Sequence, residues 1–155
     1  MRMAIDLAVS AAEKGEVPVG AVIVKNGEVI ATAENLKERY NSATRHAEIV
    51  CMERAAKKLN NWWLEDCELY VTLEPCPMCA GAMVMSRIKA LYFGAYDLKT
   101  GACGSKVNLL EKDLFNHNIE VQGGILEKEC GEVISNFFRS IREEQKKAKQ
   151  NKDKD

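Results

Sequence analysis

The chain has 155 residues, which suits one domain with its own core and leaves no room for two. Its 46% hydrophobic and 29% charged residues are typical of a soluble globular domain, and no apolar run approaches the ~20 residues that span a bilayer. The formal net charge of −1 excludes a general attraction to nucleic acid, and the N-terminus lacks the apolar stretch of a secretory signal, so we expect a cytoplasmic protein.

Apolar periodicity and turn residues predict the elements in chain order. A first helix over 1–14 ends at Gly15, and Asn26-Gly27 joins strands over 19–25 and 28–33 as a hairpin. The polar residues 34–45 are expected to form a loop. The remaining predicted elements are a helix over 46–59, a strand over 68–73, a helix over 77–86, a strand over 89–94, a loop over 95–106, a short helix near 107–112, a short strand near 119–122 and a long helix from about 126.

This order predicts a single α/β domain over residues 1–148, with a mixed sheet between helices. The C-terminal end differs in charge, because residues 139–155 hold seven Lys or Arg and four Asp or Glu, a local +3, while the other 138 residues carry −4. A basic tail on an acidic body is compatible with a nucleic-acid partner, although a solvated helix end has the same composition. Residues 149–155 are low in hydrophobicity, and we expect a frayed Lys-rich tail there.

Six cysteines stand at positions 51, 67, 76, 79, 103 and 130. A chain of this size folds without disulfides, and a reducing compartment favours metal binding or burial over bridging. Only Cys76 and Cys79 are closely spaced, which makes them candidate metal ligands. The other four are predicted to be small buried apolar residues.

Two short motifs predict a zinc site. The triplet H-A-E at 46–48 opens one predicted helix, and 28 residues later E-P-C-P-M-C at 74–79 opens another. Zinc prefers imidazole nitrogen and thiolate sulfur, and two cysteines three apart at a helix start can face one point, where the helix N-terminus favours the thiolate. We therefore predict that His46, Cys76 and Cys79 bind one Zn²⁺ and leave a fourth position for water, as catalytic zinc sites do.

Glu48 is the predicted catalytic residue. Zinc lowers the pKa of bound water to about 7, and hydroxide attack on an amidine-type carbon needs a proton shuttle beside it. Glu48, two residues after His46, can reach that water without being a ligand. His-x-Glu with Pro-Cys-x-x-Cys is the signature of zinc-dependent base deaminases. The alternative is a structural zinc with a fourth ligand from Cys51, Cys67, Cys103 or Cys130, which leaves Glu48 and Glu74-Pro75 without a role.

At these residues the sequence resembles the cytidine-deaminase-like superfamily, and within it the bacterial tRNA-specific adenosine deaminases, which convert the wobble adenosine of an anticodon to inosine. The resemblance covers nearly the whole chain. Its specific pieces are V-P-V-G-A at 17–21, Asn35, H-A-E at 46–48, Y-V-T-L-E-P-C-P-M-C-A-G-A at 70–82, S-R-I at 86–88, F-G-A at 93–95, K-T-G at 99–101, N-H at 116–117, G-I-L at 124–126 and F-F-R at 137–139.

The resemblance implies a three-layer α/β/α fold with a central mixed five-stranded sheet. It implies one Zn²⁺ per chain held by His46, Cys76 and Cys79, a homodimer, and tRNA as the partner. Glu48 would shuttle protons, and the substrate-binding residues would be Asn35, Val19, Ala47, Asp97, Phe138 and Arg139. Simpler readings stay open for three positions: Asn35 as a turn residue, Phe137 or Phe138 as core, and His117 as a turn cap.

The expected reaction is hydrolytic deamination at C6 of adenine. Zinc-bound hydroxide attacks C6 while Glu48 carries the water proton to ring N1 and then to the departing ammonia. One rival reading is a deaminase of guanine, cytidine or dCMP from the same superfamily, since the zinc motif is shared. Another is a non-catalytic zinc-bearing RNA-binding module. Two departures from the family pattern, Arg45 and Trp63, affect expected substrate contacts and leave the chemistry unchanged.

Overall fold

A β-hairpin begins the sheet. In the computed structural model, which describes residues 1–152, β1 (Gly20–Lys25) and β2 (Glu28–Glu34) pair antiparallel. Asn26 and Gly27 join them with φ angles of 50° and 79°, which suit the two-residue turn predicted from this dipeptide.

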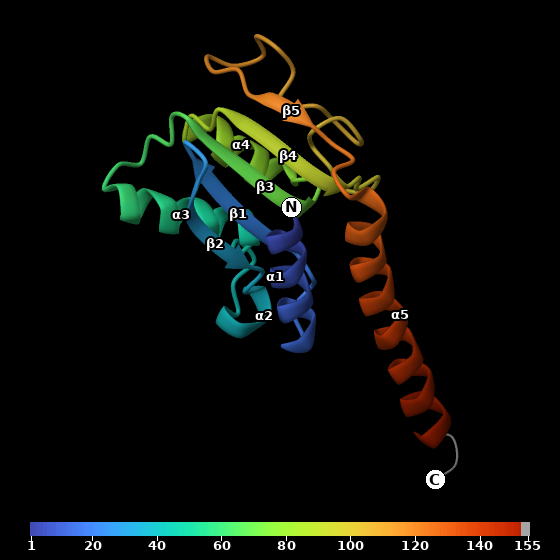
Figure 1. The fold of residues 1–155 in the computed structure, drawn as a ribbon. Helices are drawn as coiled ribbons and strands as arrows, with labels where there is room; N and C mark the ends of the chain where they lie inside the picture. Colours follow the sequence, from blue (N-terminus) through green and yellow to red (C-terminus); the bar gives the residue numbers. More distant parts are fainter. Residues whose placement is uncertain (153–155) are drawn as a thin grey trace.

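The sheet has five strands in the order β2-β1-β3-β4-β5 (Figure 1). β3 (Cys67–Leu73) pairs antiparallel with β1, whereas β4 (Ala90–Ala95) pairs parallel with β3, and β5 (Glu120–Gln122) pairs parallel with β4. The predicted mixed five-stranded sheet is confirmed. Because β3 and β4 are parallel, their C-terminal ends lie at the same edge.

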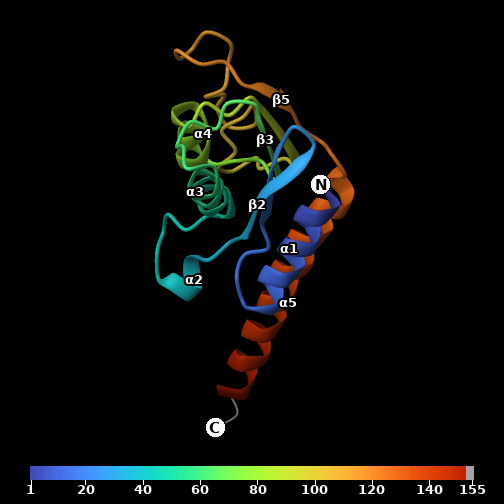
Figure 2. The same ribbon diagram turned by 60° about the vertical axis from the view of Figure 1, so that its left-hand side comes forward.

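Helices cover both faces of the sheet. Figure 2 shows α1 (Arg2–Glu13) and α5 (Glu127–Lys152) on one side, with α3 (Ala47–Leu59) and α4 (Pro77–Met85) on the other. The three-layer α/β/α arrangement is therefore confirmed. Within residues 1–152, none of the helices combines the length and apolar character that a membrane crossing requires.

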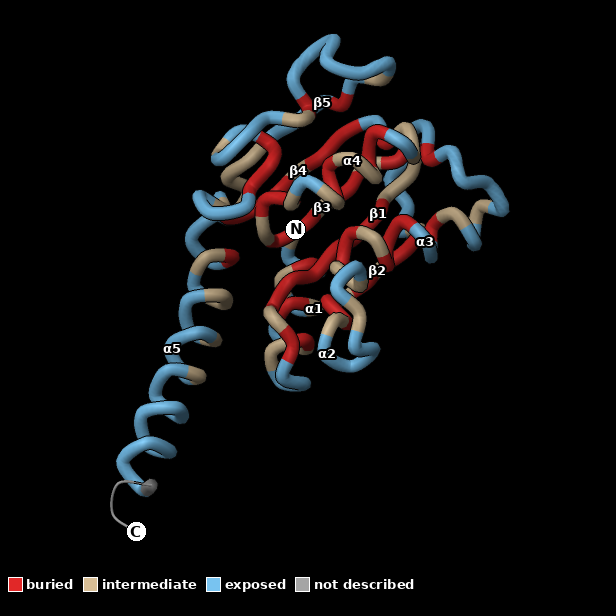
Figure 3. The backbone as a smooth tube through the Cα atoms, turned by 180° about the vertical axis from the view of Figure 1, so that it is seen from behind, coloured by how far each residue is buried: buried red, intermediate tan, exposed pale blue. Residues whose placement is uncertain are grey.

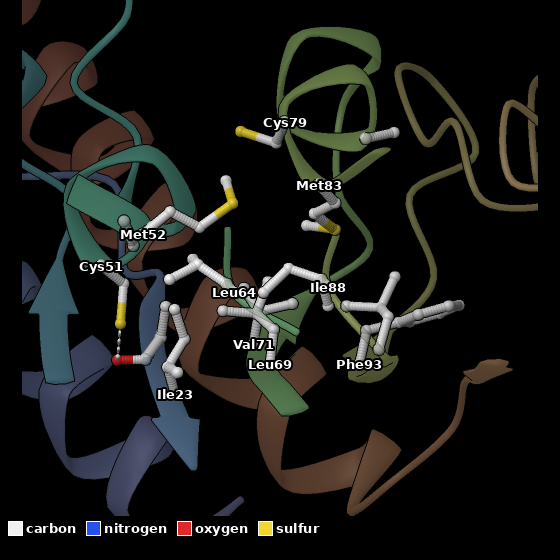
Figure 4. Packing of buried hydrophobic residues seen from close by; sticks show 14 of the residues in the cluster. Ile23, Cys51, Met52, Leu64, Leu69, Val71, Cys79, Met83, Ile88 and Phe93 are labelled. Carbon is white, nitrogen blue, oxygen red and sulfur yellow. Dashed lines mark hydrogen bonds between the residues drawn. The ribbon is translucent and has the colours of Figure 1, made fainter. Parts of the chain in front are cut away.

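The main core lies between the sheet and the layer formed by α3 and α4. Alternate strand residues point toward these helices, as the two-residue period of a strand requires. Figure 4 shows Ile23, Leu69, Val71 and Phe93 from the strands packed below Met52 and Met83 from the helices. Full burial of each such side chain contributes ~1.5–3 kcal/mol of transfer free energy, so this layer fixes the helix starts relative to the strand ends.

Two sequence predictions differ from the structure. The segment predicted as a helix near 107–112 has no helical turn: Leu109 donates its amide to Ala102, and Asn108 pairs with Cys103 across an isolated bridge. The segment 34–45, predicted as a loop, contains the short helix α2 (Lys37–Tyr40). Two buried carboxylate oxygens of Glu16 accept the backbone amides of Glu38 and Arg39, so a tertiary contact supports a helix that local pattern does not reveal.

The C-terminal helix reaches beyond the rest of the molecule. α5 continues to Lys152, so the residues 149–152 of the predicted tail are helical, while 153–155 lie outside the described residues. Figure 3 shows the outer half of α5 exposed, in contrast to the buried strands.

Candidate metal centre and substrate pocket

The candidate ligands stand where two helices begin. His46 is the N-cap of α3 and Cys76 the N-cap of α4, and Pro77 follows at the first helical position, where a missing N–H costs nothing. Cys79 lies one turn further and is fully buried. β3 ends three residues before Cys76, so the sheet edge holds the second helix start against the first.

The three ligand atoms have the spacing of a zinc site. The Nδ1 atom of His46 lies 3.6 Å from the Sγ atoms of both Cys76 and Cys79, and all candidate donor atoms lie within 4.8 Å of one another. Zn–N of about 2.0–2.1 Å and Zn–S of about 2.3 Å at the tetrahedral angle place nitrogen and sulfur about 3.5–3.6 Å apart. The donor set therefore fits a tetrahedral Zn²⁺ with one position left open.

The two sulfurs and the imidazole shift one another's pKa values. A hydrogen bond from Cys79 lowers the pKa of Cys76 to about 4, and the contact with Cys76 together with burial raises the pKa of Cys79 above its usual value. A hydrogen bond with Cys76 also raises the pKa of His46. A dication at the centre of this group favours two thiolates and a neutral imidazole, which together balance its charge.

Glu48 lies inside the core beside this cluster. Its side chain is buried in the first turn of α3, with 4% of its surface exposed, and burial raises its pKa to about 7. Cys79 does not line the cavity described next, whereas Glu48, His46 and Cys76 do. The open side of the metal cluster and the carboxyl group of Glu48 therefore face the same space.

A cavity of about 140 Å³ opens at this point. Five segments supply its wall, from the end of α1 to the loop after β4. Its lining residues are Val17, Val19, Asn35, Lys37, His46, Ala47, Glu48, Leu73, Glu74, Cys76, Asp97 and Thr100. The site residues predicted from the sequence on four segments, at 19, 35, 46–48 and 76, are thus brought together, with Asp97 at the rim.

Asn35 carries an unsatisfied polar atom in this cavity. Its Nδ2 donates to the carbonyl of Val17 at 3.3 Å, and its buried Oδ1 has no hydrogen-bond partner among the described residues. Asn35 is only 4% exposed. A buried acceptor without a partner costs about 1–3 kcal/mol, so Asn35 is a candidate for a hydrogen bond to a ligand.

Two predicted substrate residues stand apart from the cavity. Phe138 lines a neighbouring hollow of about 480 Å³, which shares Val17, Leu73, Asp97 and Thr100 with the cavity wall. Arg139 is exposed and donates to the side chain of Asn136 on its own helix. Only Phe138 is therefore adjacent to the site, as an exposed aromatic ring at its edge.

Sequence reasoning did not single out Lys37, Leu73 or Thr100 as site residues. Leu73 and Thr100 belong to segments that the family resemblance covers, and this resemblance is the one feature of the sequence that points to them as site residues. Lys37 lies in the segment predicted as a loop, and α2 brings it to the cavity.

Three residues that drew attention in the sequence have other contacts. His117 Nε2 lies 2.7 Å from the carbonyl of Ile88, away from the cavity, which agrees with a turn-stabilising role. Arg45 pairs with Glu53 at 3.1 Å and lies over the ring of Tyr40. Trp63 is exposed and packs edge-on against Trp62.

The arrangement of sheet, helix starts and His/Cys/Cys cluster defines a deaminase of the cytidine-deaminase-like class. A family model described as MafB19-like deaminase matches residues 1–142. The tRNA-specific adenosine deaminase of Bacillus subtilis (strain 168) is 52% identical over 151 residues, covering 97% of this chain and 94% of that protein. That of Aquifex aeolicus (strain VF5) is 46% identical over 142 residues, covering 92% and 93%. The chain belongs to the tRNA-specific adenosine deaminase family.

Solved structures agree with this assignment. A structure from work on A-to-I editing by tRNA:A34 deaminases at the wobble position of transfer RNA superposes with a TM-score of 0.83 at 43% identity, covering 86% of this chain and 96% of that chain. A guanine deaminase from Nitrosomonas europaea superposes with a TM-score of 0.77 at 23% identity, covering 88% and 81%, which shows the shared fold alone.

Proposed function

We propose that the chain is a zinc-dependent deaminase that converts the wobble adenosine of a tRNA anticodon to inosine. The observation that carries the proposal is the cavity of about 140 Å³, whose wall holds His46 and Cys76 of the metal-binding cluster, the buried Glu48, and Asn35, whose buried amide oxygen has no partner among the described residues. The 52% identity to a tRNA-specific adenosine deaminase supports adenosine in tRNA as the substrate.

His46, Cys76 and Cys79 would hold the Zn²⁺, since their donor atoms have the spacing of a tetrahedral site. When bound, zinc supplies a Lewis acid that activates water for attack on an amidine carbon. The burial of Cys79 shields the cluster from solvent on the inner side and leaves the cavity as the open side.

Glu48 would carry the protons of the reaction. Its place in the cavity wall, two residues from His46, lets its carboxyl group take a proton from the attacking water and deliver it to ring N1. A C6–O bond forms, the C6–N bond breaks, and the second proton transfer leaves ammonia and inosine as products.

Substrate binding requires the base to leave its stack. The cavity has a volume of about 140 Å³, which suits a single base that has left its stack, so we propose an unstacked nucleotide of an RNA loop as the substrate. Asn35 would hydrogen-bond the nucleoside, Val19 and Ala47 would pack against it, and Asp97 and Phe138 would border the adjoining RNA. Arg139 would contact RNA further along α5.

The family resemblance also leads us to propose a homodimer that acts in the cytoplasm. The molecular mass of the zinc-loaded protein, measured by light scattering with and without an anticodon stem-loop, tests the assembly. A mass of one chain at micromolar concentration in both samples would contradict it.

The deciding experiment is incubation with total tRNA followed by inosine mapping, with guanine, cytidine and dCMP assayed in parallel for ammonia release. We expect inosine at an anticodon wobble position and no turnover of the three small substrates. Turnover of a small substrate without inosine in tRNA would assign the chain to another deaminase activity. No turnover on any substrate with zinc bound would favour a non-catalytic RNA-binding module.

Glu48→Gln tests the proton shuttle. We expect kcat to fall by the upper part of the 10²–10⁴-fold range typical of a general acid–base group, with zinc content and tRNA affinity retained. Glu53→Gln is the matched control, because Glu53 is exposed on the same helix and pairs with Arg45, away from the cavity. Turnover of Glu48→Gln within about tenfold of wild type would refute the role, and loss of zinc would make Glu48 a ligand.

A further inference from the structure

Glu74 is a buried carboxylate that the proposed chemistry does not use. It follows β3 directly, is 2% exposed, and lies two residues before Cys76. Its partners all come from the loop of residues 97–105, which follows β4. Oε1 accepts the amides of Cys103 and Ser105 at 3.1 and 3.0 Å, and Oε2 accepts the amide of Asp97 at 3.0 Å and the hydroxyl of Ser105.

These four donors use both oxygens of the carboxylate. A carboxylate only accepts hydrogen bonds, and each of its oxygens here faces two donors. Hydrogen bonds to a charged acceptor are roughly twice as strong as neutral ones, and they offset the cost of burying the charge. A neutral amide in place of Glu74 would turn an NH₂ group toward two backbone N–H groups in one orientation and toward the N–H of Asp97 in the other.

The 97–105 loop forms one wall of the substrate cavity, through Asp97 and Thr100. Asp97 closes a tight turn in it, because its Oδ1 accepts the amides of Lys99 and Thr100 and its Oδ2 accepts the Thr100 hydroxyl. Burial raises the pKa of Asp97, but the hydrogen bonds from Thr100 outweigh it and hold that pKa below its ordinary value. The turn is thus self-contained, and Glu74 attaches it to the sheet.

Gly101 shows how closely the loop approaches this carboxylate. A Cβ atom at position 101 would lie 2.4 Å from Cδ of Glu74 and 2.4 Å from the carbonyl oxygen of Asp97. Ala102 donates its amide to the carbonyl of Pro75 at 2.8 Å, beside the metal-binding motif. The loop, the carboxylate and the start of α4 therefore form one packed unit.

We propose that Glu74 is a positioning residue that holds the 97–105 loop as a preformed wall of the substrate cavity. Asp97 and Thr100 are then in place before the nucleoside enters, and binding does not include the cost of ordering the loop. The inference rests on the proposed function. Glu74 also lines the cavity, but both of its oxygens are bound to the loop, so it acts through the loop.

The test compares Glu74→Gln with wild type in the full-length, zinc-loaded protein. We expect amide hydrogen exchange to become at least about tenfold faster at Asp97, or at Cys103 and Ser105, because an NH₂ group replaces one of the two acceptor oxygens. With tRNA as substrate, KM should rise about 10- to 100-fold while kcat changes by less than about threefold, as expected for lost binding that is equal in ground and transition states. Zinc content should be unchanged.

Glu68→Gln is the matched control, since Glu68 lies on the β3 strand just before Glu74, and its carboxylate accepts the hydroxyl of Tyr70 and none of the amides of the 97–105 loop. Ser105→Ala removes a single donor and should give a smaller change in the same direction, which decides the matter if Glu74→Gln does not fold. Unchanged exchange in the loop, unchanged KM, a fall confined to kcat, or loss of zinc would each overturn the proposal. If wild type makes no inosine, the proposed function fails, and the exchange comparison alone decides the role of Glu74.

Discussion

At the scale of single residues, the metal cluster depends most on Cys79. It is fully buried, and its sulfur lies 3.6 Å from the same imidazole nitrogen that Cys76 faces. Cys79→Ser should reduce bound zinc from about one ion per chain to a small fraction, because a hydroxyl is a poor substitute for a thiolate. The melting temperature should fall with the metal, since zinc binding is coupled to folding.

Metal analysis of the purified variant checks this expectation. Cys51→Ser is the matched control, because Cys51 is also fully buried but donates to the carbonyls of Ala21 and Ala31, as a hydroxyl can. Its zinc content should equal that of wild type. Full zinc occupancy in Cys79→Ser would remove Cys79 from the site.

Asn35 offers a second test at this scale. Asn35→Ala removes the buried amide whose oxygen lacks a partner, so kcat/KM for tRNA should fall about 5- to 150-fold, the equivalent of ~1–3 kcal/mol, with zinc retained. Asn61→Ala is the control for a turn role, because Asn61 accepts the amide of Trp63 far from the cavity. If Asn35→Ala lowers the stability of the protein but leaves kcat/KM for tRNA unchanged, Asn35 is a turn residue.

The sequence reveals some of these residues because their signals are local. His46, Cys76 and Cys79 carry recognisable donor atoms at helix starts, and the structure brings them together. Lys37 and Thr100 carry no such signal, since they become cavity residues only through contacts of Glu16 with α2 and of Glu74 with the loop after β4. The nearness of Arg139 to the site was suggested by family resemblance, and its contact in this structure is to Asn136.

At the scale of secondary structure, the long elements and the short strand near 119–122 follow from local pattern, whereas α2 and the segment 107–112 do not. The Asn26-Gly27 hairpin, the strands at 68–73 and 89–94, and the helix starts at 46 and 77 agree with the structure within one or two residues. Near 107–112 the apolar spacing of Val107 and Leu110 imitates a helix. The backbone there is instead bound to residues 102–104, in a tight reversal of the chain that apolar spacing does not reveal.

The packing of α1 on β1 shows another feature hidden from pattern reasoning. A Cβ atom at Gly20 would lie 2.0 Å from the carbonyl oxygen of Ala4 and 2.8 Å from the amide nitrogen of Ala8, both in the backbone of α1. Gly20→Ala should therefore displace α1 and destabilise the fold by about 1–3 kcal/mol or more, as overpacking does. Urea denaturation measures the change.

Gly81→Ala is its control, since a Cβ at Gly81 meets nothing within 4 Å and the residue lies inside α4. That substitution should stabilise the protein by about 0.5–1 kcal/mol, because alanine favours the helix. Equal changes in the free energy of unfolding for the two substitutions would show that the close approach of α1 does not explain why residue 20 is a glycine.

At the scale of the whole molecule, charge and shape divide the chain into an acidic body and a basic arm. The body, residues 1–138, contains the three layers and the cavity. The arm is the outer part of α5 from residue 139, and its residues 142–151 are exposed (Figure 3). Phe138 lies beside the cavity, and Lys149 is eleven residues further along the helix, about 16 Å away at the rise of an α-helix. RNA bound at the cavity would therefore reach the arm if it extends over this distance along α5.

The arm is tested by deleting residues 146–155, which hold five Lys and two Asp, a net +3. If its lysines meet two or three phosphates, tRNA affinity should fall and the slope of log affinity against log salt should flatten by ~1.4–2.1, at ~0.7 per phosphate of single-stranded RNA. Zinc content and turnover at saturating tRNA should barely change, because contacts far from the base act on binding. Lys57→Gln with Lys58→Gln, at the far end of α3 from His46, should leave the slope unaltered. Parallel lines for the deletion and wild type, with equal affinity, would show that the arm is solvated surface and that the body alone binds the RNA.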